Sequence, residues 1–226
     1  MAFELREIVP WGRNYDEYVR MFGLSESDLK GKILGCGDGP ASFNVEATRR
    51  GCQVVSIDPV YRFSTAEIRS RIVEVRTEVM KNARENQAQF RWTYFKTPDD
   101  LERCRVGAMD RFLDDFDAGK IEGRYLTGEL PQLPFADGAF DLAVVSHLLF
   151  LYSKLMDAEL HIASIRELLR VSREVRIFPL LDLTAKPSVH LQAVMDALES
   201  EWKVRVVKVD YEFQIGGNEM LVIGRK

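Results

Sequence analysis

The sequence predicts an α/β fold, in which a doubly wound and mostly parallel sheet carries helices on both faces. Short apolar runs alternate with amphipathic helical patterns along most of the 226 residues, which is typical of parallel βαβ units. The first unit also contains three glycines at alternate positions, directly after an apolar run at 32–36. A parallel sheet places such a turn at its carboxyl edge, where open α/β sheets bind ligands.

Seven strands are expected from the apolar runs, at 32–36, 53–57, 124–127, 140–146, 175–180, 203–213 and 219–223. The helical patterns cover 14–22, 41–50, 65–86, 99–118, 158–170 and 188–198. Gly216, Gly217 and Asn218 supply turn chemistry between the last two strands. The chain therefore reverses there, and we expect an antiparallel C-terminal strand.

One segment is longer than an alternating fold needs. Residues 62–121 separate the second and third expected strands, where a loop and one helix suffice. Two helical stretches fill this segment, and Thr97-Pro98-Asp99-Asp100 opens the second with an N-cap, a proline at the first helical position and acids in the first turn. We interpret residues 1–226 as a single domain with a helical insertion between strands 2 and 3, at about 62–121, packed on the sheet.

Composition and charge restrict the class of protein. Hydrophobic content of 46% and charged content of 29% are ordinary for a globular protein, and the formal charge of −4 gives no basic footprint for nucleic acid. No apolar run approaches the roughly 20 residues of a membrane helix. Residues 1–7 carry acids and lack the apolar core of a secretory signal. We therefore expect a cytoplasmic protein whose partners are neither nucleic acid nor membrane.

The cysteines and histidines predict no metal site. Cys36, Cys52 and Cys104 lie far apart and form no CxxC pair, which favours a reducing compartment without a disulfide framework or zinc. The only imidazoles are those of His147, His161 and His190. The last two lie in helical patterns, so a three-histidine site is disfavoured.

Gly35-Cys36-Gly37-Asp38-Gly39 and the acid at 58 together indicate a nucleoside pocket. Glycine lets the backbone approach a ligand closely. Asp58 follows Gly39 by 19 residues, about the separation at which a carboxylate reaches ribose hydroxyls. A nicotinamide site prefers G-x-G-x-x-G with amides aimed at a pyrophosphate, whereas Pro40 removes an amide donor here. A tight strand-to-helix turn without a ligand is the structural alternative.

These features resemble the class I S-adenosylmethionine (SAM)-dependent methyltransferases. The resemblance is carried by five segments in family order: the glycine loop at 35–39, Asp58, Gly128-Glu129-Leu130, Leu133 to Leu142, and Ile165 to Val171. It runs from about Tyr15 to the C terminus and leaves 62–121 outside. Two positions depart from the family pattern, because Ile33 stands where an acid is frequent and Ser172-Arg173-Glu174 replaces a proline-glycine-glycine turn.

The resemblance implies a Rossmann-like fold, SAM as cofactor and S-adenosylhomocysteine (SAH) as product. It implies that the cofactor is bound by Gly35, Cys36, Gly37, Gly39, Asp58, Pro59, Glu129, Leu130, Ser146 and Tyr15. In this picture Asp58 holds the ribose, Glu129 or the Leu130 amide reads adenine, and Tyr15 folds over the cofactor from the N-terminal helix. His147, at the end of the fourth strand, is the candidate general base or acceptor-orienting residue.

The sequence leaves more than one function open. A methyltransferase acting on a small molecule is favoured by the absence of a basic surface and by the aromatic run Phe90 to Phe95, which either walls a substrate pocket or forms core beneath the insertion. A non-catalytic module that binds SAM or another nucleoside is the alternative, and a nicotinamide-dependent oxidoreductase is a third hypothesis. The motifs do not indicate the methyl acceptor.

Overall fold

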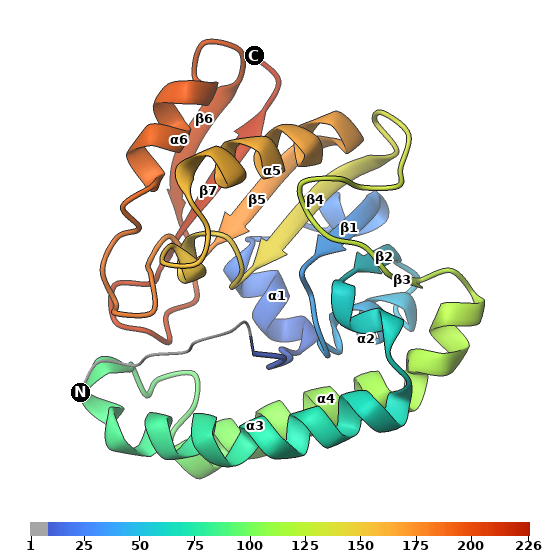
Figure 1. The fold of residues 1–226 in the computed structure, drawn as a ribbon, viewed down its shortest axis with the longest axis vertical. Helices are drawn as coiled ribbons and strands as arrows, with labels where there is room; N and C mark the ends of the chain where they lie inside the picture. Colours follow the sequence, from blue (N-terminus) through green and yellow to red (C-terminus); the bar gives the residue numbers. More distant parts are fainter. Residues whose placement is uncertain (1–8) are drawn as a thin grey trace.

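Seven strands form one sheet in the computed structural model, which describes residues 9–226 (Figure 1). The strands are β1 (Lys32–Cys36), β2 (Gln53–Ile57), β3 (Tyr125–Leu126), β4 (Phe140–Ser146), β5 (Ser172–Phe178), β6 (Lys203–Lys208) and β7 (Glu219–Gly224). Their order across the sheet is β3-β2-β1-β4-β5-β7-β6. All neighbours pair in parallel except β7, which is antiparallel to both β5 and β6. The predicted Rossmann-like fold with a reversed C-terminal strand is confirmed.

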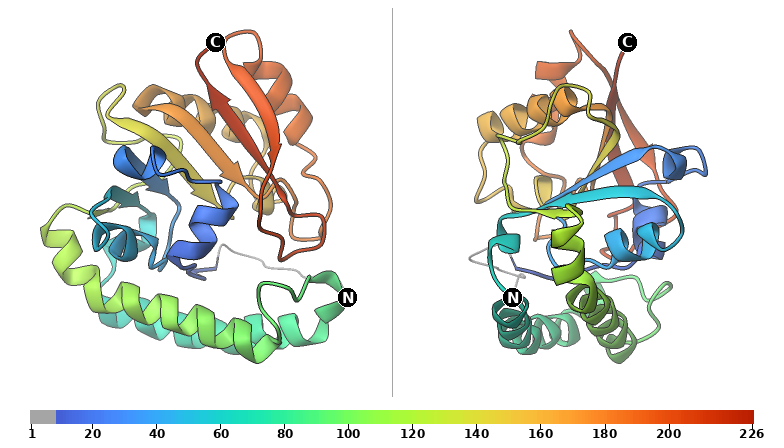
Figure 2. Two further views of the ribbon diagram at one scale, coloured as in Figure 1. Left: turned by 180° about the vertical axis from the view of Figure 1, so that it is seen from behind. Right: turned by 90° about the vertical axis from the view of Figure 1, so that its right-hand side faces the viewer.

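Helices cover both faces of this sheet (Figure 2). The helices α5 (Ala158–Val171) and α6 (Leu191–Leu198) pack on one face, and α1 (Tyr15–Met21) and α2 (Phe43–Thr48) pack on the other. Successive side chains of a strand point to opposite faces, so Leu34 joins the first apolar cluster and Ile33 the second. Burial on both faces explains why the central strands are continuously apolar in sequence.

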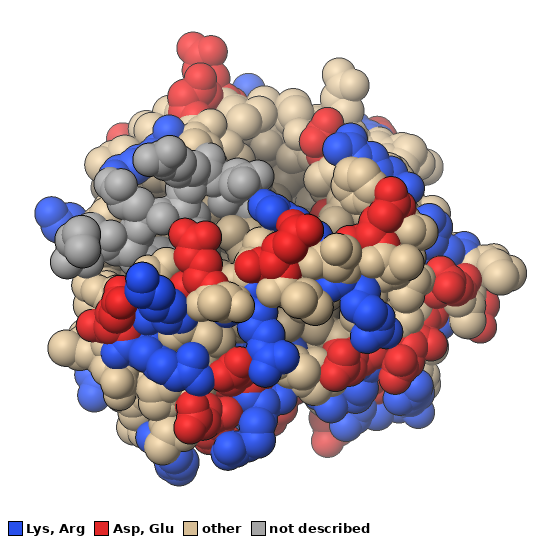
Figure 3. Space-filling view, turned by 60° about the horizontal axis from the view of Figure 1, so that its bottom comes forward, with Lys and Arg blue, Asp and Glu red and all other residues tan. Residues whose placement is uncertain are grey.

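The insertion forms a helical hairpin that runs across the carboxyl ends of the strands (Figure 1). Its helices are α3 (Thr65–Glu85) and α4 (Pro98–Ile121), which begin at the N-caps Ser64 and Thr97. Ile72, Met109 and Phe112 belong to the apolar cluster between them. Lys and Arg side chains intermix with Asp and Glu on the outer surface, and several form ion pairs between the two helices (Figure 3). The hairpin therefore extends the carboxyl edge of the sheet, and α4 packs against the edge strand β3 through the cluster that includes Phe116 and Tyr125.

Several strand boundaries differ from the sequence prediction, and β6 ends at Lys208 and not at 213. Strand β3 has only two residues, and β5 begins at Ser172, three positions before the expected start. The Ser172 hydroxyl donates to the carbonyls of Leu168 and Glu174, at 2.7 and 3.1 Å. These bonds stabilise the junction at which α5 ends at Val171 and β5 begins at Ser172, so no proline-glycine-glycine turn is needed between the two elements.

No helix within residues 9–226 combines the length and apolar character needed to cross a membrane. The interpretation of residues 1–7 concerns a part of the chain that lies outside the described residues.

Candidate functional site

A cleft lies at the carboxyl edge of the sheet, where β1, β2 and β4 end. It encloses about 1690 Å³, open solvent included. Nine of the predicted site residues line it: Cys36, Gly37, Gly39, Asp58, Pro59, Glu129, Leu130, Ser146 and His147. These residues come from four separate segments, which the parallel sheet brings together because it aligns the carboxyl ends of its strands.

Asp58 faces this cleft from the end of β2. Its two carboxylate oxygens accept hydrogen bonds from the backbone N–H of Gly39 and of Val60, both at 2.8 Å. Burial raises the pKa of Asp58 to about 6, since the two hydrogen bonds stabilise the ionised form less than burial and Glu129 oppose it. Each oxygen accepts only one of these bonds, so the group keeps acceptor capacity for hydroxyl donors.

The glycines of the loop are required for different reasons. Gly37 and Gly39 have φ angles of 70° and 53°, in the left-handed region that favours glycine. A Cβ at Gly37 would lie 2.5 Å from Leu148 Cδ2, so a side chain there meets the protein's own wall of the cleft. A Cβ at Gly35 would lie within 2 Å of Asp38 Oδ2, and Gly35 is not among the residues that line the cleft. Its contact with a cofactor stays a prediction.

Asp38 is a cleft residue that the sequence analysis did not select. It is only 6% exposed, and its carboxylate accepts hydrogen bonds from the hydroxyls of Ser56 at 2.6 Å and Tyr18 at 2.8 Å. Burial raises its pKa to about 6 against the effect of these bonds. The only feature of the sequence that could have indicated Asp38 is its position as an acid inside the glycine loop. Its two hydrogen bonds connect the loop to α1 through Tyr18 and to β2 through Ser56.

Tyr15 does not line the cleft, whereas Tyr18 of the same helix does. The Tyr15 ring stacks on Phe43 at 6.0 Å, and the Arg50 guanidinium lies 4.2 Å above it. Tyr15 and Tyr18 are three residues apart and so lie on neighbouring positions of the helix surface. Their side chains nevertheless have different partners, because Tyr18 donates a hydrogen bond to Asp38 and Tyr15 packs on Phe43 of α2. Contact between Tyr15 and a cofactor therefore remains a prediction.

His147 follows β4 and has a positive φ of 54°, which is uncommon for a residue with a side chain. Its backbone N–H donates to the Phe178 carbonyl at 2.7 Å, and its Nδ1 lies 3.0 Å from the Ser146 hydroxyl. Burial, Arg13 and Arg105 hold the pKa of His147 well below 6.5. The imidazole is therefore neutral at physiological pH, and such strained residues cluster at functional sites.

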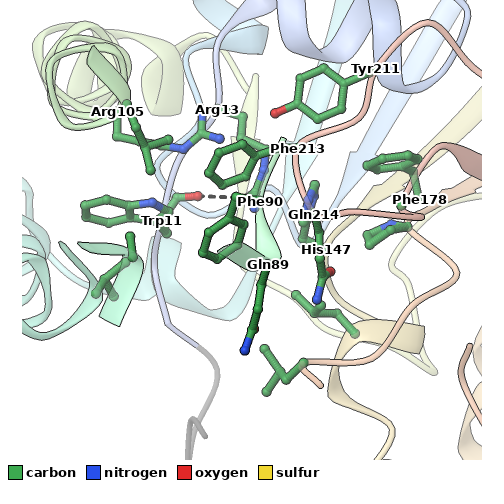
Figure 4. A pocket seen from close by; sticks show the side chains of 17 residues that line it. Trp11, Arg13, Gln89, Phe90, Arg105, His147, Phe178, Tyr211, Phe213 and Gln214 are labelled. Atoms are coloured by element: carbon green, nitrogen blue, oxygen red, sulfur yellow. Dashed lines mark hydrogen bonds between the residues drawn. The ribbon is translucent and has the colours of Figure 1, made fainter. Parts of the chain in front are cut away.

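A second cavity adjoins the cleft beneath the insertion (Figure 4). It encloses about 800 Å³, open solvent included. Aromatic rings dominate its wall: Trp11, Phe90, Phe178, Tyr211 and Phe213. Trp11, Arg13 and His147 line both the cavity and the cleft, so the two spaces meet at these side chains.

A buried ion pair joins the insertion to the core beside this cavity. Arg105 of α4 is 2% exposed and pairs with Glu17 of α1, which is fully buried. Glu17 also accepts a hydrogen bond from the Tyr211 hydroxyl at 2.7 Å. Burial opposes ionisation of Glu17, but Arg105, Arg13 and the Tyr211 bond outweigh it and place its pKa below the ordinary value.

Within residues 9–226, no group of three or more His, Cys, Asp or Glu side chains is arranged to hold a metal ion. The three imidazoles are divided between two places. The ring centres of His161 in α5 and His190 at the start of α6 are 5.0 Å apart, and His147 lies at the cleft.

The strand order, the reversed β7 and the glycine loop at the carboxyl edge define a Rossmann-like α/β protein of the kind that class I SAM-dependent methyltransferases use. The chain is 36% identical over 222 residues to the uncharacterized protein MJ0045 of Methanocaldococcus jannaschii, and the match covers 98% of both chains. The chain therefore belongs to the same protein family as MJ0045. No protein-family model matches it.

Solved structures of methyltransferases show a weaker likeness. Magnesium protoporphyrin IX methyltransferase from Synechocystis PCC 6803, solved with bound SAM, has a TM-score of 0.45 and 13% identity, over 89% of this chain and 73% of that one. A putative SAM-dependent methyltransferase from Methanococcus maripaludis has a TM-score of 0.46 and 12% identity, over 93% and 83%. Both TM-scores are below 0.5, and neither likeness supports a particular activity for this chain.

Proposed function

We propose that this protein is a SAM-dependent methyltransferase that acts on a small molecule. The observation that supports this most directly is Asp58, a carboxylate at the end of β2 that fixes the glycine loop through Gly39 and still faces the cleft. A nucleoside bound at the edge of the sheet needs a hydroxyl acceptor at this place.

The residues present fit the cofactor. Asp58 would accept hydrogen bonds from the ribose hydroxyls, and the bare backbone of Gly37 and Gly39 would lie against the ribose and methionine portion. Glu129, which is exposed at the rim, and Leu130 would contact the adenine. When bound, SAM supplies a methyl group that its sulfonium has already activated for displacement.

The protein's own contribution is to position the acceptor. Orientation alone lowers a barrier by as much as about 7–11 kcal/mol in ideal cases, so methyl transfer needs no elaborate catalytic apparatus. His147 lies where the cleft meets the aromatic cavity, and its neutral imidazole would orient an acceptor or receive its proton. The cavity would hold the acceptor because its apolar wall excludes water.

A non-catalytic SAM-binding module is the second candidate. Ile33 of β1 is fully buried among apolar side chains, so β1 offers no acid at the position where class I methyltransferases often carry one. Calorimetric titration with SAM, SAH and NAD tests the cofactor assignment, and NAD binding in place of SAM would contradict it. Transfer of labelled methyl from SAM to members of a compound library separates an enzyme, which turns over, from a module that only binds.

A further inference from the structure

The aromatic cavity has a polar feature that its apolar lining does not need. Its wall includes two guanidinium groups, those of Arg13 and Arg105, and the imidazole of His147. Glu17 pairs with Arg105 and accepts hydrogen bonds from the Tyr211 hydroxyl and the Asn14 backbone N–H. Its negative charge also favours the charged form of Arg13. One carboxylate therefore serves two guanidinium groups, and one positive charge at the cavity has no carboxylate of its own within the described part of the chain.

Arg13 carries that charge. Its Nη1 donates a hydrogen bond to the Trp11 carbonyl at 3.0 Å, and its buried Nε has no partner among residues 9–226. Figure 4 shows the Arg13 side chain beside Arg105 and near the rings of Phe90 and Phe213. Burial and Arg105 lower the pKa of Arg13 to about 10 and outweigh the opposing effect of Glu17, so the surroundings of Arg13 disfavour its charge. An anion placed beside it reverses that balance.

The walls around Arg13 suit a flat molecule. Phe90 and Phe213 line the cavity and stack with their ring centres 4.7 Å apart and their planes 11° apart. Trp92, which lies outside the lining, supports Phe213 through an edge contact at 5.5 Å. Phe178 and Tyr211 form an edge contact at 5.9 Å on the opposite side, next to His147. Aromatic walls of this kind bind planar ring systems through stacked and edge contacts.

We propose that the acceptor of this protein is a planar aromatic or conjugated carboxylic acid whose carboxylate pairs with Arg13 inside the cavity. This inference rests on the proposed function, because it assigns the cavity to the methyl acceptor. The guanidinium supplies a fork of N–H donors that matches a carboxylate, and Arg13 lies where the cavity meets the cleft. The bound acid would then present its nucleophilic atom beside His147.

The test uses 2-naphthoate and its neutral amide, 2-naphthamide, as probes in calorimetric titrations of the full chain, with and without saturating SAH. We expect naphthoate to bind at least about tenfold more tightly than the amide to the native protein. Arg13→Gln should abolish this preference and leave the SAH affinity within about threefold, and Arg13→Lys should retain part of it. Arg205→Gln, at an exposed position on β6, is the matched control and should change neither affinity.

Several results overturn the inference. Equal affinity of the native protein for naphthoate and naphthamide would show that the cavity does not recognise an anion. Loss of SAH affinity in Arg13→Gln would show that Arg13 binds the methionine carboxylate of the cofactor instead. Absence of naphthoate binding beside normal SAH binding refutes the acceptor class and leaves the proposed function standing. Naphthoate binding that depends on Arg13 in a protein without affinity for SAM or SAH refutes the proposed function, and with it the role of the acid as methyl acceptor, and leaves only the anion site at Arg13 standing. Thermal unfolding of each variant identifies any loss of fold.

Discussion

Asp58 fixes Gly39: its Oδ2 accepts the Gly39 backbone N–H at 2.8 Å and so ties the end of β2 to the last glycine of the loop after β1. The same carboxylate lines the cleft. One side chain thus shapes the loop and offers an acceptor to the ligand, which makes it the first residue to test.

Replacing Asp58 by alanine should weaken SAH binding by more than about tenfold, equivalent to about 1.4 kcal/mol. The loss has two causes, because the ribose loses its acceptor and the loop loses its bond at Gly39. Calorimetric titration measures the affinity, and circular dichroism reports the fold. Asp210→Ala, at a side chain that is 97% exposed, is the control. Unchanged affinity in Asp58→Ala contradicts the ribose assignment.

Gly37→Val should abolish SAH binding. Valine at a φ of 70° is strained, and its Cβ would approach Leu148 to 2.5 Å in the wall of the cleft. Gly51→Val is a matched control, because Gly51 also has a positive φ of 84° but no atom within 4 Å of an added Cβ. The control should lose stability from strain and keep its affinity. Normal titration of Gly37→Val would exclude a close approach of ligand to the loop.

The affinity for SAH should fall as the pH is lowered through about 6. The pKa of Asp58 is raised to about 6 in the free protein. Ribose hydroxyls donate hydrogen bonds to the ionised carboxylate, so below this pH the Asp58 carboxyl must lose its proton before the ribose binds. By the same linkage, the stability of the free protein declines as the pH rises from about 4 to about 6, since the folded state retains protons that the unfolded state has released. Asp58→Asn should flatten the profile of affinity against pH. A dependence that persists there points to Asp38, whose pKa is also about 6.

His147→Ala should reduce methyl transfer at least about tenfold while the SAH affinity stays within about threefold. His147 touches both the cleft and the aromatic cavity, so its loss disturbs the acceptor more than the cofactor. Because its pKa lies well below 6.5, the native rate should show no step from this imidazole between about pH 6.5 and 8. Full activity in the variant removes His147 from the mechanism.

Glu17→Gln should lower the free energy of unfolding by about 3–5 kcal/mol, because it leaves the buried Arg105 without a charge partner. Urea denaturation measures this loss. Glu201→Gln breaks an exposed pair with Arg166 and should cost less than about 1 kcal/mol. The lowered pKa of Glu17 has a second consequence, since its stabilisation is present above the ordinary glutamate pKa and disappears as the pH falls below about 4. A loss equal to that of the exposed pair would show that the buried pair does not hold the insertion.

Local pattern by itself determined the sheet and the loop of this protein. Strands β1, β2 and β4 have the bounds that their apolar runs predict, because strands buried on both faces must be continuously apolar. The alternate glycines and the acid at 58 likewise indicated the turn and its polar partner, since both depend on the backbone of a single βαβ unit.

Only the tertiary structure decided which side chains share the site. Tyr18 instead of Tyr15 reaches the cleft, the carboxylate of the loop residue Asp38 is buried, and Arg105 pairs with Glu17 across 88 residues of sequence. The position of Arg13 between cleft and cavity depends on α3 and α4 lying across the carboxyl ends of the strands. Periodicity along a chain reports which face of an element is buried, but it contains no information on which distant element covers that face.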